Sequence, residues 1–207
     1  ILGCTEEQKT SALPGAYGEK KAEMERLLLG HTKMDKVILR PSLVYGKYDF
    51  TDRFYYWLWR AKFTGKILLP DGGKDMTSIT YVDDLAGLVM AAMDAAKHNT
   101  VYNAATHRVT IKQMPETAAR VMETTPQYVP VDGKKLLDAG VEPWQDIPLW
   151  LKGDLDIPLT KAEKDFNFTP TRFDDTVLSA INYYAALGWP PCKYGLTPEK
   201  EKELLAI

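Results

Sequence analysis

The stretch TSITYVDDLAGLVMAAMDAAKHNTVYNA, residues 77–104, contains the pattern that decides the fold class. Its first six residues are rich in β-branched side chains, which is typical of a strand. Asp83 and Asp84 are predicted to cap the apolar helix that follows over residues 85–96. A second strand is expected at residues 100–104. Strand, helix and strand in this order predict a parallel sheet and therefore an α/β fold.

The segments before this stretch continue the alternation of helices and strands. A helix is expected at residues 16–29 and a strand at residues 36–40, which Pro41 ends. The aromatic run within residues 52–63 favours a helix capped by Thr51 or Asp52, although a strand also suits the same residues. The remaining expected strands are 67–69 and 128–131; the remaining expected helices are 110–122, 134–139, 160–166, 174–187 and 197–205, with a turn at 70–73 and irregular chain at 141–158.

Composition and charge exclude several classes of protein. The 26 Lys and Arg residues almost balance the 28 Asp and Glu residues, so there is no basic excess to bind nucleic acid, and no nucleic-acid partner is expected. The longest apolar stretches are far shorter than the roughly 20 residues of a membrane span, so no membrane partner is expected. Cys4 and Cys192 lie far apart, which predicts no metal site, no disulfide framework and a reducing, cytoplasmic location.

Tyr17 and Lys21 are the candidate catalytic residues. Their spacing of four residues places both side chains on one face of the expected helix, about one turn apart. An ammonium group near a phenol favours the phenolate, so the pair is suited to exchange a proton with a substrate hydroxyl. The alternative interpretation is a solvent-facing Tyr and Lys on a charged helix.

Five motifs in a fixed order resemble the later part of an extended short-chain dehydrogenase/reductase, the NAD-dependent epimerase/dehydratase family. Residues 17–25, YGEKKAEME, resemble its active-site helix, and residues 37–46, VILRPSLVYG, are similar to its strand ending in R-P-x-x-V-Y-G. The other three matching segments are SITYVDDLA at 78–86, VYNAA at 101–105 and the stretch from Thr160 to Thr176. Residues 51–57 and 147–150 also resemble a reductase-like bacterial branch.

The resemblance implies a role for each matching residue. Tyr17 is implied as the acid/base toward the substrate oxygen, and Lys21 as the residue that holds the nicotinamide ribose and favours the tyrosinate. Pro41 and the backbone of Ser42, Leu43 and Val44 are implied to contact the nicotinamide end of the cofactor, which is expected to be NAD or NADP. The implied substrate is a small sugar-like or reductase-type molecule that reacts at a hydroxyl or carbonyl group.

The resemblance also implies the domain organisation. Residues 1–45 are expected to form the end of a Rossmann-like parallel-sheet domain, to which residues 82–105 return. Residues 46–207 are expected to form mainly a small α/β substrate-binding domain. The expected fold class is therefore α/β, the later part of a Rossmann-like domain plus a substrate domain.

The sequence departs from the family pattern at three places. No Gly-rich turn opens a helix, although backbone amides in such a turn bind the cofactor pyrophosphate. The family's Ser or Thr before the active-site helix would lie upstream of Ile1, so we expect the chain to begin after it and to pair as a homodimer or with a missing N-terminal fragment. Thr77 occupies the place of an Arg that binds the diphosphate of nucleotide sugars, which argues against such a substrate.

A non-catalytic function is the alternative hypothesis. A relative of this family can use a nucleotide-binding fold as a sensor or as an RNA-associated scaffold. The presence of both Tyr17 and Lys21 argues against such a role, and the balanced charge argues against RNA.

Overall fold

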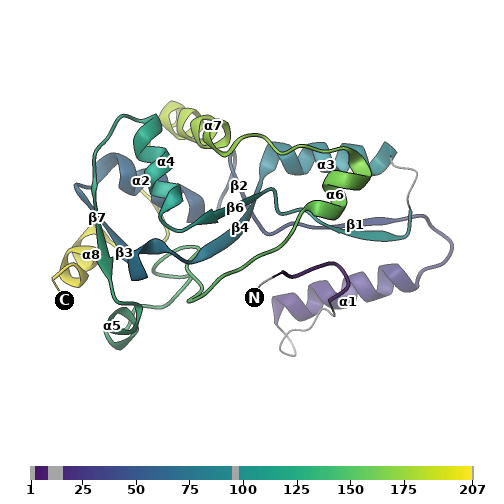
Figure 1. Cartoon of the computed structure of the whole chain (residues 1–207), viewed down its shortest axis with the longest axis horizontal. Coiled ribbons are helices and arrows are strands. Elements are labelled where there is room, and N and C mark those ends of the chain that lie inside the picture. The colour runs from purple at the N-terminus through teal and green to yellow at the C-terminus, as the bar shows by residue number, and fades with distance from the viewer. Residues whose placement is uncertain (1–2, 9–15, 95–97, 207) are drawn as a thin grey trace.

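The computed structural model describes residues 3–8, 16–94 and 98–206. Helices and strands alternate along most of the described chain (Figure 1). The helices are α1 (Tyr17–Gly30), α2 (Arg53–Phe63), α3 (Val82–Asp94), α4 (Gln113–Val121), α5 (Gly133–Asp138), α6 (Thr160–Phe166), α7 (Phe173–Ala186) and α8 (Pro198–Leu204), with a 3₁₀ turn η1 (Asp71–Gly73). The strands are β1 (Val37–Arg40), β2 (Leu43–Tyr45), β3 (Lys66–Pro70), β4 (Met76–Tyr81), β5 (Thr100–Asn103), β6 (His107–Thr110) and β7 (Gln127–Val131).

The described strands form three small sheets, and three of the four strand pairings are parallel. β1 pairs with β5, β2 with β4, and β3 with β7 in parallel, whereas β6 runs antiparallel to β4. The expected α/β fold with parallel strands is confirmed. The two strands on either side of α3 do not pair with each other, because β4 and β5 lie in different sheets. Helix α3 contacts α6, β4 and β1, and strand β5 after it pairs with β1.

Buried apolar side chains form two clusters. The smaller cluster joins α3, β5 and α6 through Leu88, Tyr102 and Ala162, with Val37 and Leu39 of β1 packed against it. The larger cluster contains the buried aromatic face of α2, together with side chains of β3, β4, α4 and α7. Helix α6 therefore packs with the β1–β5 pair although it follows residue 46. The division into residues 1–45 and 46–207 stays a prediction.

Asp83 and Asp84 do not cap α3 from outside, as the sequence had suggested, because the helix already begins at Val82. Both carboxylates lie in its first turn, where they favourably face the helix dipole. Asp84 is buried and accepts hydrogen bonds from the backbone N–H and the hydroxyl of Thr171. This contact ties the start of α3 to the segment that leads into α7.

The C-terminal segment packs closely on α2. Gly195 has a φ of +87°, and a Cβ at this position would collide with the ring of Tyr56, so both conformation and space require glycine. Arg60 of α2 donates a hydrogen bond to the carbonyl of Leu196 and pairs with Glu201 of α8. Leu196 therefore belongs to the larger core, and buried Glu201 anchors α8 beside it.

Candidate active site

An ion pair fixes the candidate active-site helix α1 on strand β1. The guanidinium of Arg40, the last residue of β1, contacts both carboxylate oxygens of Glu25, with Nε donating to Oε2 at 2.9 Å. Both side chains are largely buried. The hydrogen bond to Glu25 raises the pKa of the Arg40 guanidinium above its ordinary value. The guanidinium therefore stays charged, and its contact with Glu25 sets the position of α1 along β1.

The contact between Glu25 and Arg40 places Tyr17, at the start of α1, beyond the carboxyl end of β1. Helix α1 lies beside β1 and runs in the opposite direction (Figure 1). Tyr17, Lys21 and Glu25 follow one another at intervals of four residues, so they form one stripe along the helix. Tyr17 precedes Glu25 by eight residues, which is about 12 Å of helix. Because Glu25 lies level with Arg40, the first turn of α1 extends past the edge where α/β folds bind ligands.

The side chains of Tyr17 and Lys21 are open to solvent. Tyr17 is 78% exposed and Lys21 is also exposed. Within the described residues, neither side chain forms a hydrogen bond or an ion pair. Both are therefore free to contact a ligand, and their contact with Pro41 stays a prediction.

The segment that follows β1 is only partly available to a cofactor. Pro41 is exposed, and Ser42, Leu43 and Val44 are half-buried. The backbone N–H of Ser42 donates to Thr80 Oγ1 at 3.0 Å, and its hydroxyl donates to the carbonyl of Ser78. Both donors of Ser42 are thus engaged by β4. A nicotinamide at this place would contact the Pro41 ring and the backbone carbonyls rather than these donors.

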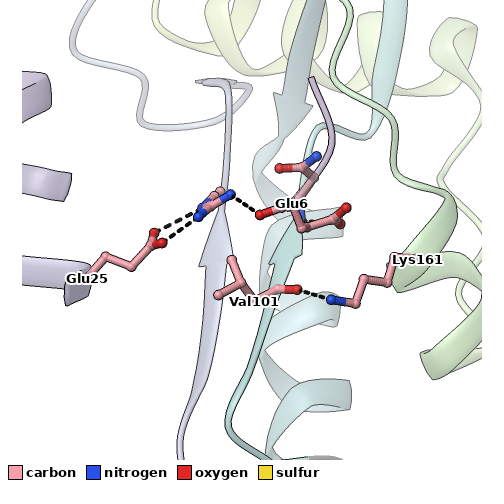
Figure 2. A network of polar contacts seen from close by, with 6 residues as sticks. Glu6, Glu25, Val101 and Lys161 are labelled. Carbon is pink, nitrogen blue, oxygen red and sulfur yellow. Dashed lines mark hydrogen bonds and ion pairs between the residues drawn. The ribbon is translucent and has the colours of Figure 1, made fainter. Parts of the chain in front are cut away.

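Residues 3–8 lie across the same edge of the sheet, a feature that the sequence analysis missed. Arg40 Nη1 donates to the carbonyl of Glu6 at 3.1 Å, and the Glu6 carboxylate accepts from the backbone N–H of Asn103 at 2.9 Å (Figure 2). The Asn103 side chain donates to the carbonyl of Cys4 at 2.8 Å. Arg40, Glu25 and Asn103 all lie within the family motifs, so the motifs alone could have suggested that these residues matter.

Thr77 is buried rather than available to a ligand. The residue is 1% exposed and lies on the face of β4 that it shares with Ile79 and Tyr81, both members of the larger core. Among the described residues, its hydroxyl has no hydrogen-bond partner. Lys74, the nearby cation, is exposed on the turn before β4. Neither side chain supplies the guanidinium that the family resemblance implies as the contact to the diphosphate of a nucleotide sugar.

His107 is half-buried on β6 and belongs to a polar network. Its Nε2 donates to the carbonyl of Thr171 at 2.7 Å, and its Nδ1 lies 3.0 Å from the Thr106 hydroxyl and 3.3 Å from that of Tyr45. Burial lowers the pKa of His107 below its ordinary value. The network joins β2, β6 and the start of α7, so its role is structural.

The described residues contain neither a candidate metal site nor a candidate membrane-spanning helix. No group of three or more His, Cys, Asp and Glu side chains in residues 3–8, 16–94 and 98–206 is arranged to hold a metal ion. Among the helices of these ranges, none has the length and apolar character to cross a membrane.

The parallel strands and the helices between them give an α/β fold that resembles the Rossmann type. A model of the NAD dependent epimerase/dehydratase family matches residues 4–105, the part that contains α1, β1, α3 and β5. Residues 4–105 belong to this family. No match to the chain exists among curated proteins.

Several solved structures have a similar fold. MoeE5 in complex with UDP-glucuronic acid and NAD is 18% identical, with a TM-score of 0.65 over 90% of this chain and 60% of MoeE5. WbmF from Bordetella bronchiseptica in complex with NAD⁺ is 16% identical, with a TM-score of 0.66 over 89% of this chain and 58% of WbmF. The UDP-glucuronic acid 4-epimerase from Bacillus cereus is 17% identical, with a TM-score of 0.62 over 82% and 52%. The chain thus spans between 52% and 60% of these structures.

Proposed function

We propose that this chain supplies the acid/base part of an NAD(P)-dependent epimerase, dehydratase or reductase of the extended short-chain type. The proposal rests mainly on the stripe of Tyr17, Lys21 and Glu25 along α1. Arg40 binds Glu25, so the first turn of α1 extends past the carboxyl end of β1. Ligands of open α/β sheets bind outside this edge. Family membership supports the same reaction class.

Each residue has a distinct task in this proposal. The Tyr17 hydroxyl exchanges a proton with a hydroxyl or carbonyl oxygen of the substrate. Lys21, one turn further along α1, stabilises the phenolate by its positive charge and donates to the nicotinamide ribose. Pro41 and the carbonyls of Ser42, Leu43 and Val44 bound the nicotinamide end. NAD or NADP, when bound, supplies the redox chemistry.

The residues present fit only one end of this cofactor. Tyr17 and Lys21 are exposed and have no hydrogen-bond or ion-pair partner among the described residues, and Pro41, directly after β1, is also exposed. The chain has no Gly-rich turn at a helix N-terminus to hold the pyrophosphate. We therefore assign the nicotinamide half of the cofactor to these 207 residues and leave the pyrophosphate half to other residues.

We propose a small sugar-like or reductase-type molecule as the substrate. MoeE5 and the Bacillus cereus enzyme contain UDP-sugars in their structures, so UDP-sugars are the first compounds to test. The buried Thr77 argues against them, because no guanidinium replaces the implied diphosphate contact. Competition between a UDP-sugar and an uncharged sugar for the same site distinguishes the two substrate classes.

The partner of this chain is proposed to be a second copy or an N-terminal fragment. Among the described strands β1 pairs only with β5, so its other edge is open. Leu27 of α1 and Met93 of α3, the helices beside β1, are 67% and 72% exposed. Parallel strands are normally covered on both faces, which makes this region suited to a protein partner.

Substitution of Tyr17 by Phe tests the proposed function. In the complete enzyme the variant should lower the rate of hydride transfer by about 100-fold or more and leave cofactor affinity nearly unchanged. Tyr128→Phe is the matched control, because Tyr128 lies on β7 in a separate sheet and should keep full activity. Full activity of Tyr17→Phe would refute the mechanism and favour a sensor or scaffold.

A further inference from the structure

The contact between α1 and the rest of the protein is unusually thin. Of the fourteen residues of α1, only Ala22 is buried, and most apolar side chains of the helix are exposed. A helix that buries so little apolar surface gains little packing energy to fix its position. The Glu25–Arg40 pair must therefore contribute much of what determines where α1 lies.

Arg40 also holds the segment that crosses the edge of the sheet. Its Nη1 donates to the carbonyl of Glu6 at 3.1 Å, while its other donors contact Glu25. The Glu6 carboxylate in turn accepts from the N–H of Asn103, at the end of β5. Figure 2 shows Glu6 and Glu25 on opposite sides of the strand, with the dashed contacts meeting between them. One guanidinium thus connects α1, β1 and residues 3–8.

We propose that Arg40 is a positioning residue, which sets the axial position of α1 so that Tyr17 and Lys21 stand at the carboxyl edge of the sheet. The proposal rests on the proposed function, because it assigns Arg40 to the same site. Arg40 itself does not touch the substrate; it acts through Glu25. A shift of α1 by one residue moves Tyr17 by about 1.5 Å, and small displacements of a reacting group reduce rates strongly.

The geometry requires arginine at this position. The planar guanidinium provides donors to both oxygens of Glu25 and a further donor to the Glu6 carbonyl. A lysine ammonium is a single centre on a flexible chain and does not make this two-sided contact. Arg40→Lys keeps the positive charge but loses the planar arrangement of donors. The variant therefore distinguishes a role in positioning α1 from a role in neutralising the charge of Glu25.

Hydrogen exchange of the purified 207-residue chain is the direct test. In Arg40→Lys and in Glu25→Gln, amides of residues 17–30 should exchange at least about 10-fold faster than in the wild type, because the paired contact between the guanidinium and both carboxylate oxygens of Glu25 is lost. Amides of β3 and β7 should keep their rates, because these strands belong to another sheet. Arg26→Gln is the control: it removes exposed pairs with Glu19 and Glu23 on the same helix and should leave exchange within about 2-fold.

Two results would overturn the proposal. Unchanged exchange of residues 17–30 in Arg40→Lys would show that α1 is held by other contacts. Equal acceleration in β3 and β7 would show that Arg40 supports the whole fold rather than the position of α1. Both outcomes are independent of catalysis.

A kinetic measurement separates this proposal from the proposed function. In the complete enzyme, Arg40→Lys should lower kcat by about 10-fold or more with little change in the KM for cofactor, and Arg26→Gln should change neither. If Tyr17→Phe is fully active while exchange in α1 responds to Arg40→Lys, the proposed function fails and the positioning role stands. If kcat is unchanged in Arg40→Lys, positioning by Arg40 is refuted even where Tyr17 is catalytic.

Discussion

The substitution Glu201→Ala tests how the C-terminal helix is held on the core. Glu201 Oε2 lies 2.6 Å from Arg60 Nη1, and the two side chains are only 4% and 1% exposed. Glu201 Oε1 also accepts a hydrogen bond at 3.0 Å from the backbone N–H of Leu68 in β3. Alanine at position 201 therefore leaves a buried cation and a buried N–H without their partner.

The expected loss of stability follows from these two contacts. Removing one member of a buried ion pair costs about 3 to 5 kcal/mol, because the other charge remains buried. The unpaired N–H of Leu68 adds to this cost. A loss of about 4 kcal/mol in the free energy of unfolding corresponds to a fall of about 8 to 16 °C in Tm for a chain of this size. Burial raises the pKa of Glu201 in spite of the nearby Arg60, so the attraction between the two charges does not fully offset the cost of burying the carboxylate.

Urea denaturation of three variants measures this effect. Glu201→Ala should lose about 4 kcal/mol, whereas the double variant Arg60→Met/Glu201→Leu should lose about 2 kcal/mol or less, because no charge stays buried. Lys200→Ala is the control on the same helix: it breaks an exposed pair with Glu203 and should cost less than about 0.5 kcal/mol. A loss below about 1 kcal/mol in Glu201→Ala would refute the reasoning, since it would mean that water or a rearranged side chain replaces the carboxylate.

Two further predictions concern pH and cofactor. Burial lowers the pKa of His107, so below about pH 6.5 the unfolded chain binds a proton that the folded chain resists, and stability should fall as the pH is lowered further. His107→Gln should remove this part of the pH dependence of unfolding, whereas His98→Gln, at an exposed position, should not. Calorimetric titration of the isolated chain with NAD and NADP should detect no micromolar binding, because the pyrophosphate has no Gly-rich turn to bind; micromolar binding by a monomer would contradict this.

Local sequence signals predicted most of the fold, and they failed where pairing depends on distant residues. The helix at residues 16–29 and the aromatic helix at residues 52–63 appear as α1 and α2. The strands β2 and β6 were missed, because β2 has only three residues and β6 has a polar sequence. Both segments form strands because they pair with β4, and their own residues do not favour a strand strongly enough to predict it.

Part of the candidate site followed from spacing alone. The interval between Tyr17 and Lys21 determines that they share a helix face, whatever the helix packs against. The position of that face does not follow from spacing, because it depends on Arg40, 15 residues beyond Glu25 in the chain. The burial of Thr77 also required the structure, since only the strand pairing shows which face of β4 meets the core.

The proposed partner and the proposed cofactor site are connected through the open edge of β1. A parallel strand is stable when strands pair with both of its edges and helices cover both faces, and β1 has one described neighbour and two helices with exposed apolar side chains. The pyrophosphate of a dinucleotide is bound in such folds by the turn between a strand and a helix of the same sheet. A strand and helix that covered the open edge of β1 would extend the sheet toward the place where such a turn lies. Coverage of the apolar surface and completion of the cofactor site would then be parts of a single association, with Arg40 holding α1 in place on the side that this chain supplies.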